Sequence, residues 1–286
     1  MPYHRCTVLR TAGITPRMRR ITVGGESLRD YIHTGRFDEH CQVWFPRPGE
    51  TAIDIPTDTG NPMRQPPLAR IFTVRRLDRE AGEIDIDFFL HDGGIATPWA
   101  LNAKPGDPFV LTDSHGHDVI PEDTDWQLFI GDSAALPAIA LVLEQLPDGV
   151  PATIVGIIPH DAERDALPGR AGVDLRWVVA TRPAEIIAAT VDAFHGFERP
   201  AGNGYVWVGG EATAARSIRR TLRAGKVPSH RFSAVGYWRD NSEAWEERYD
   251  AMATIVEARV TAARKAAADR DSFLEELDRI HIDAGL

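Results

Sequence analysis

Residues 1–121 hold six short segments rich in β-branched and aromatic side chains. One of them, Ile84–Phe88, alternates apolar and acidic residues strictly, which predicts a strand with one face inside a core. Turn signals such as Pro105–Asp107 divide the segments. Six strands in this length predict a small antiparallel β-barrel. The six segments span residues 3–11, 17–23, 41–45, 71–77, 84–90 and 109–112.

From Trp126 the pattern changes to short apolar runs followed by helical periodicity. Strands that alternate with helices predict βαβ units and a parallel sheet, which binds ligands beyond the carboxyl ends of its strands. We therefore predict a two-domain α+β/α/β chain, with a barrel domain at 1–121 and an α/β domain at 122–240. The predicted strands are 128–130, 153–158, 175–180, 205–208 and 232–238, and the predicted helices are 136–146, 183–194 and 211–223.

Residues 241–286 read as a helical extension with one apolar stripe, broken near Asp269. The stripe predicts a helix that packs back on the body of the protein or pairs in a dimer; we expect a monomer, with the dimer as the alternative. Its members recur at spacings of three and four: Trp245, Tyr249, Met252, Val256, Val260 and Ala263. A second irregular segment, 51–67, holds four prolines and two aspartates and predicts a long exposed loop.

Charge and cysteine content narrow the function. A net charge of −10 disfavours nucleic acid, which requires a basic face. Cys6 and Cys41 sit in apolar stretches and not in a spaced cluster, as expected of reduced thiols in a reducing compartment. No run approaches the roughly 20 apolar residues that span a bilayer, and the N-terminus shows no apolar signal region. These features predict a cytoplasmic protein without membrane insertion.

The segment Arg70–Arg75 carries a cation, an aromatic ring and a hydroxyl on one strand. Arg70 and Phe72 share one face, and Thr73 points to the other. Such a strand can hold a flavin through a guanidinium on phosphate, a ring packed on the cofactor and a hydrogen bond to the isoalloxazine edge. Taken alone, an ordinary amphipathic strand is the more common explanation.

A glycine turn strengthens the flavin interpretation. Gly93 and Gly94 follow a strand and open a short helix, whose free backbone N–H groups are suited to a pyrophosphate. His91 before the turn and Thr97 after it can add hydrogen-bond donors.

These motifs resemble the siderophore-interacting protein family of the ferredoxin reductase-like superfamily, from Tyr3 to about Arg239. The family patterns are Arg-x-Tyr-Thr-x-Arg, Asp-Phe-x-x-His, Gly-x-Ala-Ser-x-Trp-Ala and Pro-Gly-Asp. In the second half they are Gly-Asp-Glu-Thr-Ala-Leu-Pro-Ala-Ile, Ala-Gly-Glu-Ala and Gly-Tyr-Trp-Arg. The matching residues lie at Arg70, Thr73, Arg75, Asp87, Phe88, His91, Ala96, Trp99, Ala100, 105–107, 131–139, 209–212 and 236–239.

The resemblance implies FAD and NADH or NADPH as cofactors and assigns residues to each. The residues expected at FAD are Arg70, Ile71, Phe72, Thr73, Val74, Asp87, Phe88, Phe89, His91, Ala96 and Thr97. Those expected at the nicotinamide nucleotide are Gly131, Asp132, Ser133, Gly210 and Glu211, with Trp238 near the flavin ring. Arg239, Arg64 and Lys104 are expected contacts for an anionic siderophore.

The chain departs from the family pattern at four places. Phe72 stands where tyrosine is usual, so ring packing survives without the hydroxyl. Thr97 replaces serine, and Ser133 replaces glutamate. The segment Ser114–His117 replaces Gly-Pro-x-Gly, which alters one expected flavin contact.

The implied activity is a ferric-siderophore reductase that passes electrons from NADH or NADPH through FAD to Fe(III) and releases Fe(II) in the cytoplasm. No catalytic side chain is needed, and a ferredoxin is a further candidate donor. The alternatives are a non-redox siderophore-binding or iron-chaperone protein, a general flavin or ferredoxin reductase, and a protein metal site at His115 and His117. The choice of NADH or NADPH stays open, because residues 160–170 mix acidic and basic side chains.

Overall fold

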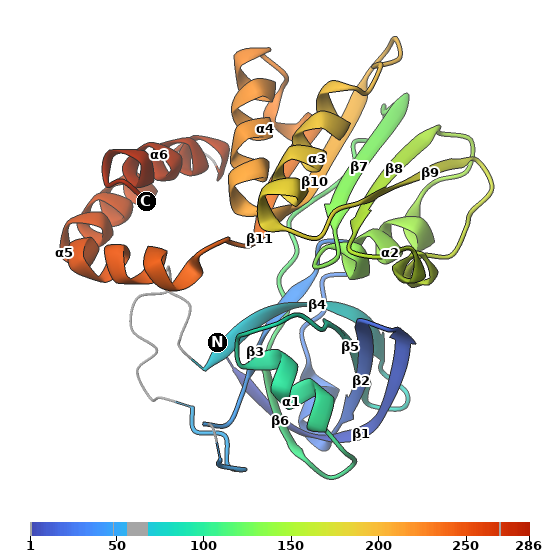
Figure 1. Ribbon diagram of the computed structural model, residues 1–286, viewed down its shortest axis with the longest axis vertical. Helices are drawn as coiled ribbons and strands as arrows, with labels where there is room; N and C mark the ends of the chain where they lie inside the picture. The colour runs from blue at the N-terminus through green and yellow to red at the C-terminus, as the bar shows by residue number, and fades with distance from the viewer. Residues whose placement is uncertain (1, 48, 56–67, 269) are drawn as a thin grey trace.

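The computed structural model describes residues 2–47, 49–55, 68–268 and 270–286. Most of the predicted loop 51–67, including Arg64, lies outside the described residues. Figure 1 shows a barrel below, a parallel sheet with helices above, and a helical hairpin at one side.

The first domain is a closed barrel of six antiparallel strands in the order β1-β2-β5-β4-β3-β6. This confirms the predicted barrel. Its interior is filled by apolar side chains that alternate with outward ones, and the short helix α1 (Ala96–Asn102) adds Trp99 and Ala100 to that core. The strands are β1 (Tyr3–Thr15), β2 (Met18–Gly24), β3 (His40–Trp44), β4 (Ala69–Asp78), β5 (Glu83–Phe89) and β6 (Pro108–Thr112).

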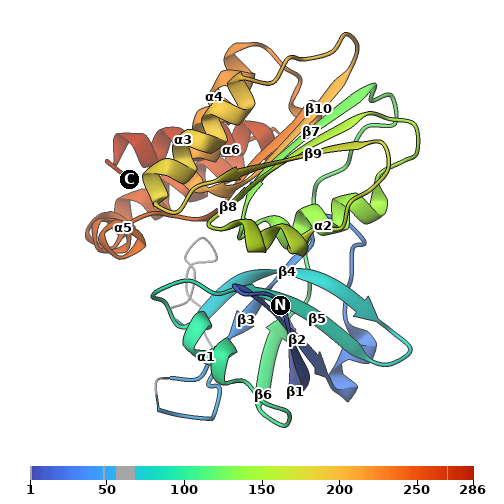
Figure 2. The ribbon, with the colours of Figure 1, turned by 45° about the vertical axis from the view of Figure 1, so that its right-hand side comes forward.

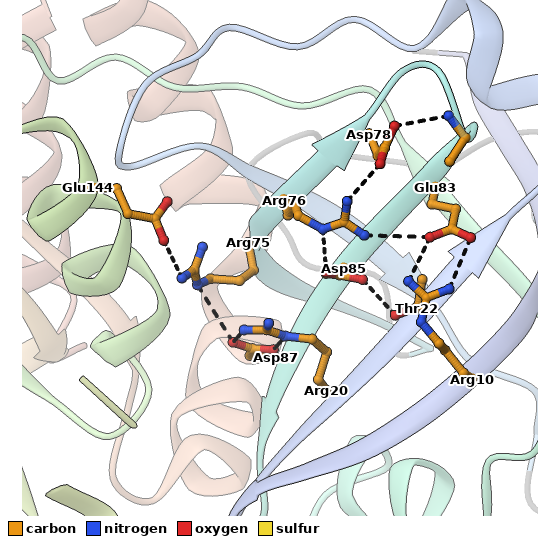
Figure 3. Close-up of polar contacts among 11 residues, drawn as sticks. Arg10, Arg20, Thr22, Arg75, Arg76, Asp78, Glu83, Asp85, Asp87 and Glu144 are labelled. Carbon is orange, nitrogen blue, oxygen red and sulfur yellow. Dashed lines mark hydrogen bonds and ion pairs between the residues drawn. The ribbon is translucent and has the colours of Figure 1, made fainter. Parts of the chain in front are cut away.

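The strict alternation in β5 predicts one buried face, but both faces are buried. Asp85 and Asp87, on the outer face, are 3% and 7% exposed. Guanidinium groups from neighbouring strands cover them: Arg76 bonds Asp85, and Arg20 bonds Asp87 (Figure 3). A buried carboxylate needs such partners, and they come from the preceding strand β4 for Asp85 and from the more distant β2 for Asp87.

The second domain is a five-stranded parallel sheet, which confirms the predicted sheet, and its strand order is β11-β10-β7-β8-β9. The order in which the chain adds strands to the sheet reverses direction between β7 and β10, the place at which sheets of this kind bind ligands. The strands are β7 (Trp126–Asp132), β8 (Ala152–Ile158), β9 (Val173–Val179), β10 (Gly204–Glu211) and β11 (Phe232–Trp238).

Helices cover both faces of the sheet. Helix α2 (Leu136–Gln145) lies over β4 of the barrel in both views (Figures 1 and 2), so it separates sheet from barrel. The helices α3 (Pro183–His195) and α4 (Ala212–Ala224) pack on the opposite face. The short 3-10 turns are η1 (Glu26–Asp30), η2 (Asp161–Ala166) and η3 (Ser229–Arg231).

The C-terminal extension is a hairpin of α5 (Ser242–Ala266) and α6 (Arg270–Asp283), so the predicted break is confirmed. The apolar stripe of α5 packs on α6 within the same chain, with Tyr249, Val256 and Val260 buried. Asp278 of α6 accepts two hydrogen bonds from Arg219 of α4, at 3.0 and 2.6 Å. The hairpin therefore packs back on the body through α4. In the described part of the chain, no helix has both the length and the apolar character that crossing a membrane requires.

Candidate cofactor site at the domain junction

The outer face of the barrel turns its polar side chains toward the second domain. His40 on β3 lies opposite Thr73 on β4, and Arg20 on β2 lies opposite Asp87 on β5. Thr73 is 5% exposed, and its side chain lies near Tyr237 at the end of β11. Burial raises the pKa of Tyr237, and the Asp38 carboxylate adds to this rise. The strand singled out in the sequence thus lies directly under the carboxyl edge of the sheet.

Alternation along β4 separates the other residues expected at FAD. The Phe72 ring packs against Phe88, with ring centres 4.3 Å apart, and Val74 is buried in the barrel core. Ile71 faces outward and is 55% exposed. Arg70 donates a hydrogen bond to the Ala69 carbonyl at 2.7 Å. Phe72 is only partly buried, which leaves part of its ring accessible at the barrel wall.

Asp87 is fully engaged with other side chains of the barrel. Its two oxygens accept hydrogen bonds from Arg20 at 2.7 and 2.8 Å, and Arg75 approaches to 3.9 Å. Arg75 also pairs with Glu144 of α2 at 2.5 Å (Figure 3). The carboxylate therefore links β5 to β2 and to β4, and Arg75 in turn links the barrel to α2. Phe89 adjoins this region, and its ring stacks on His91 at 6.4 Å.

The glycine turn after β5 has the conformation that glycine allows. Gly93 and Gly94 have φ values of 89° and 72°, a left-handed region that side chains disfavour. The His91 N–H donates to the Thr97 hydroxyl at 3.2 Å, which closes the turn onto α1. Ala96, in the first turn of α1, packs on the barrel core.

Asp132 joins three strand ends at the carboxyl edge of the sheet. One of its oxygens accepts from the Trp238 ring N–H at 2.7 Å and the Glu211 N–H at 3.0 Å. The other accepts from the Ala134 N–H at 3.0 Å. Burial raises the pKa of Asp132 to about 6, against the opposing effect of these hydrogen bonds.

Two glycines are required at this edge. Gly210 has a φ of 151°, and a Cβ there would lie 2.4 Å from an Asp132 oxygen. A Cβ on Gly131 would lie 2.6 Å from Ile139 of α2. The structure thus gathers Gly131, Asp132, Ser133, Gly210 and Glu211 at one edge, but both carboxylates point into the protein. Glu211 caps α4 by accepting from the Ala214 N–H at 3.2 Å.

The basic residues expected at the siderophore are not brought together. Arg239 is partly buried, with its guanidinium 4.6 Å from the centre of the Trp245 ring in α5. Burial lowers the pKa of Arg239, and Arg216 adds to this effect. Lys104 is exposed on the turn before β6, at the end of that strand farthest from the second domain. Arg64 lies outside the described residues.

Two junction contacts were missed in the sequence. Tyr237 stands in the Gly-Tyr-Trp-Arg motif, which could have pointed to it. Glu163 of η2 is 1% exposed and accepts hydrogen bonds from the Thr15 hydroxyl and from the Arg17 N–H at 3.1 Å. No sequence signal distinguished Glu163 from the acidic residues around it.

His115 and His117 each have a ring 6.5 Å from that of His40. Across residues 2–47, 49–55, 68–268 and 270–286, no three His, Cys, Asp or Glu side chains converge as metal ligands would.

The barrel and parallel sheet form the two-domain ferredoxin reductase-like fold. The ferredoxin NADP⁺ reductase of Neisseria gonorrhoeae, solved with FAD and NADP, superposes with a TM-score of 0.58 at 12% identity, over 83% of this chain and 100% of that one. Within this class, a family model described as siderophore-interacting FAD-binding domain matches residues 7–118, and one described as siderophore-interacting protein matches residues 124–241.

Individual relatives agree with the family models. The NADPH-dependent ferric-chelate reductase of Escherichia coli (strain K12) is 31% identical over 244 residues, covering 82% of this chain and 92% of the relative. The crystal structure of a siderophore utilization protein from T. fusca is 32% identical, with a TM-score of 0.72 over 84% of this chain and 94% of that one. The chain belongs to the siderophore-interacting protein family.

Proposed function

We propose that this chain is an FAD-dependent ferric-siderophore reductase that uses NADPH and releases Fe(II) in the cytoplasm. The observation that carries the proposal is the packing of the flavin-type strand β4 against the nucleotide-type domain, where Arg75 pairs with Glu144 of α2 at 2.5 Å and Thr73 lies near Tyr237. The names of the Escherichia coli and T. fusca relatives support a ferric chelate as substrate and, for the first, NADPH as donor. The free, buried thiols Cys6 and Cys41 are compatible with a reducing compartment.

The side chains along β4 and β5 fit an FAD in a definite order. The two strands are antiparallel, so the start of β4 at Arg70 lies beside the end of β5 and the glycine turn. Arg70 and that turn would hold the pyrophosphate, Phe72 would pack on the ring system, and Thr73 would hydrogen-bond its edge. When bound, FAD supplies the chemistry: it accepts hydride and returns electrons one at a time.

The glycine-lined edge of the sheet would take the nicotinamide nucleotide. Gly131 and Gly210 flank the reversal between β7 and β10, where the missing side chains let Ile139 and Asp132 pack close to the strand ends. Asp132 holds the Trp238 indole by its N–H, which would fix that ring where nicotinamide approaches the flavin. In this proposal residues 1–121 bind FAD, 122–240 bind the nucleotide, and 241–286 shape the substrate side at Arg239.

A spectroscopic experiment tests the assignment. Purified protein saturated with FAD should show a bound-flavin absorption band that NADPH bleaches and a ferric catecholate restores. Parallel reactions with NADH, a reduced ferredoxin and ferric hydroxamates would define donor and substrate. Folded protein that retains no FAD at saturation would contradict the proposal. Binding of the ferric chelate without bleaching would favour the non-redox alternative.

Thr73→Val provides the first prediction. We expect a folded variant that retains FAD at least tenfold more weakly, because the side chain loses its hydroxyl at the cofactor edge. The matched control is Thr7→Val, on the exposed side of β1 and away from β4. Flavin content after gel filtration measures both. Equal flavin content in the two variants would remove Thr73 from the site.

A further inference from the structure

A pocket lies between the β1–β2 turn of the barrel and the carboxyl ends of β8 and β9. Its volume is ≈ 560 Å³. Arg17 and Asp92 line it from the barrel, and His160 and Thr181 line it from the second domain. The pocket therefore belongs to the same edge of the sheet as the glycines at the strand reversal, displaced toward the outer strands.

Arg17 presents its side chain from an anchored backbone. Its N–H donates to Glu163 at 3.1 Å, and its carbonyl accepts from the Leu90 N–H at 2.7 Å. Its guanidinium is exposed and forms no ion pair or hydrogen bond with any residue in the described part of the chain. Fixing the backbone lowers the entropy that the side chain loses on binding an anion.

His160 presents a second donor. Its Nδ1 accepts a hydrogen bond from the Ala162 N–H at 3.1 Å, so the neutral ring carries its proton on Nε2. That Nε2–H is free to donate to a ligand. The two oxygens of the neighbouring Glu163 accept hydrogen bonds from the Thr15 hydroxyl and the Arg17 N–H, so this carboxylate is already paired within the protein. Asp92 is the remaining carboxylate of the pocket and is exposed to solvent.

We infer that this pocket takes the adenosine end of the nicotinamide nucleotide and that Arg17 and His160 bind its 2′-phosphate. The inference rests on the proposed function. With nicotinamide at the β7–β10 reversal, the rest of the dinucleotide lies along the carboxyl edge. Toward β11 that edge is occupied by Arg239 and Trp245, whereas toward β8 and β9 it opens into the pocket. A guanidinium and an imidazole N–H recognise a phosphate; the hydroxyl that NADH carries there gains far less from them.

The test uses binding of fragments to the FAD-loaded protein, measured by calorimetry. Adenosine 2′,5′-bisphosphate should bind at least tenfold more tightly than 5′-AMP, which lacks the 2′-phosphate. Arg17→Ala should abolish this difference, and His160→Ala should reduce it. The matched control is Arg176→Ala, because Arg176 lines a second pocket, which lies at the opposite, amino-terminal edge of the sheet. The control should leave the difference intact.

Kinetics give the second measurement. Arg17→Ala should raise KM for NADPH tenfold or more and leave KM for NADH unchanged. Equal affinity of the wild type for the two fragments, or unchanged selectivity in Arg17→Ala, overturns the inference. Either result leaves the reductase proposal standing if NADH bleaches the flavin. Conversely, fragment selectivity that depends on Arg17 supports the inference even if no nucleotide bleaches the flavin.

Discussion

Arginines meet carboxylates in two different ways in this molecule. On the outer face of the barrel the charges are matched, as Figure 3 shows for Arg10, Arg20, Arg75 and Arg76 with Asp78, Glu83, Asp85, Asp87 and Glu144. Between α4 and the C-terminal hairpin, several arginines instead converge on one carboxylate. There Arg216, Arg219 and Arg223 all lie within 4 Å of the single carboxylate of Asp278.

The pKa shifts reflect this difference. On the barrel, burial raises the pKa of Asp85. The hydrogen bonds from Arg76 and Thr22 lower this pKa by more than burial raises it, so the net shift is downward. At the hairpin, burial and the nearby Arg216 lower the pKa of Arg239 and bring that of His281 to about 4. The matched network ties strands and domains together. The arginines around Asp278 concentrate positive charge beside the end of β11. This is the side of the molecule at which an anionic iron complex is proposed to bind.

The largest effect is expected from removing the carboxylate shared by three arginines. Asp278→Asn should destabilise docking of the hairpin by about 3–5 kcal/mol, because the partly buried Arg219 guanidinium loses the carboxylate that accepts two of its hydrogen bonds. Hydrogen exchange of α5 and α6 measures this. The control is Asp283→Asn, whose pair with Arg259 is half exposed and contributes about 0–1 kcal/mol. Equal protection in both variants would show that the apolar contacts alone hold the hairpin.

A smaller effect is expected in the matched network. Asp87→Asn should lower the free energy of unfolding by about 2 kcal/mol, because Arg20 and Arg75 lose an ionic partner but Arg75 keeps Glu144. The urea midpoint measures the change. Glu144→Gln removes the exposed partner of Arg75 in the same network, and it should change the free energy of unfolding by less than about 1 kcal/mol. A loss as large as that of Asp278→Asn would erase the distinction between the two networks.

The smallest effect concerns pH. Because the folded-state pKa of His281 lies below its ordinary value, the unfolded chain binds this proton more readily. The contribution of neutral His281 to the stability of the hairpin is fully present above its ordinary pKa of 6.5. It is lost as the pH falls toward about 4. Hydrogen exchange of α6 at pH 7 and pH 5 should show faster opening at the lower pH. His281→Gln should flatten that dependence, and an unaltered slope would exclude the histidine as its origin.

The sequence was sufficient for the elements and for their order. The barrel strands, the alternating strands and helices, and the break near Asp269 follow from local periodicity, and family motifs identified β4 and the strand ends. The sequence did not predict which side chains from different strands and helices contact each other. The burial of Asp85 and Asp87 depends on arginines from other strands, and the stacking of Arg239 on Trp245 depends on the direction in which α5 leaves the sheet. Spacing along the chain encodes neither.

The Glu163 carboxylate, buried against the β1–β2 turn, bears on how electrons travel through the protein. Parting the barrel from the sheet would exchange both of these hydrogen bonds for hydrogen bonds to water, at a cost of about 1–3 kcal/mol. These contacts favour one arrangement of the two domains, and we expect it to set the distance between the hydride donor and the flavin. In such a molecule, binding and release of the reactants would limit turnover, and domain motion would not.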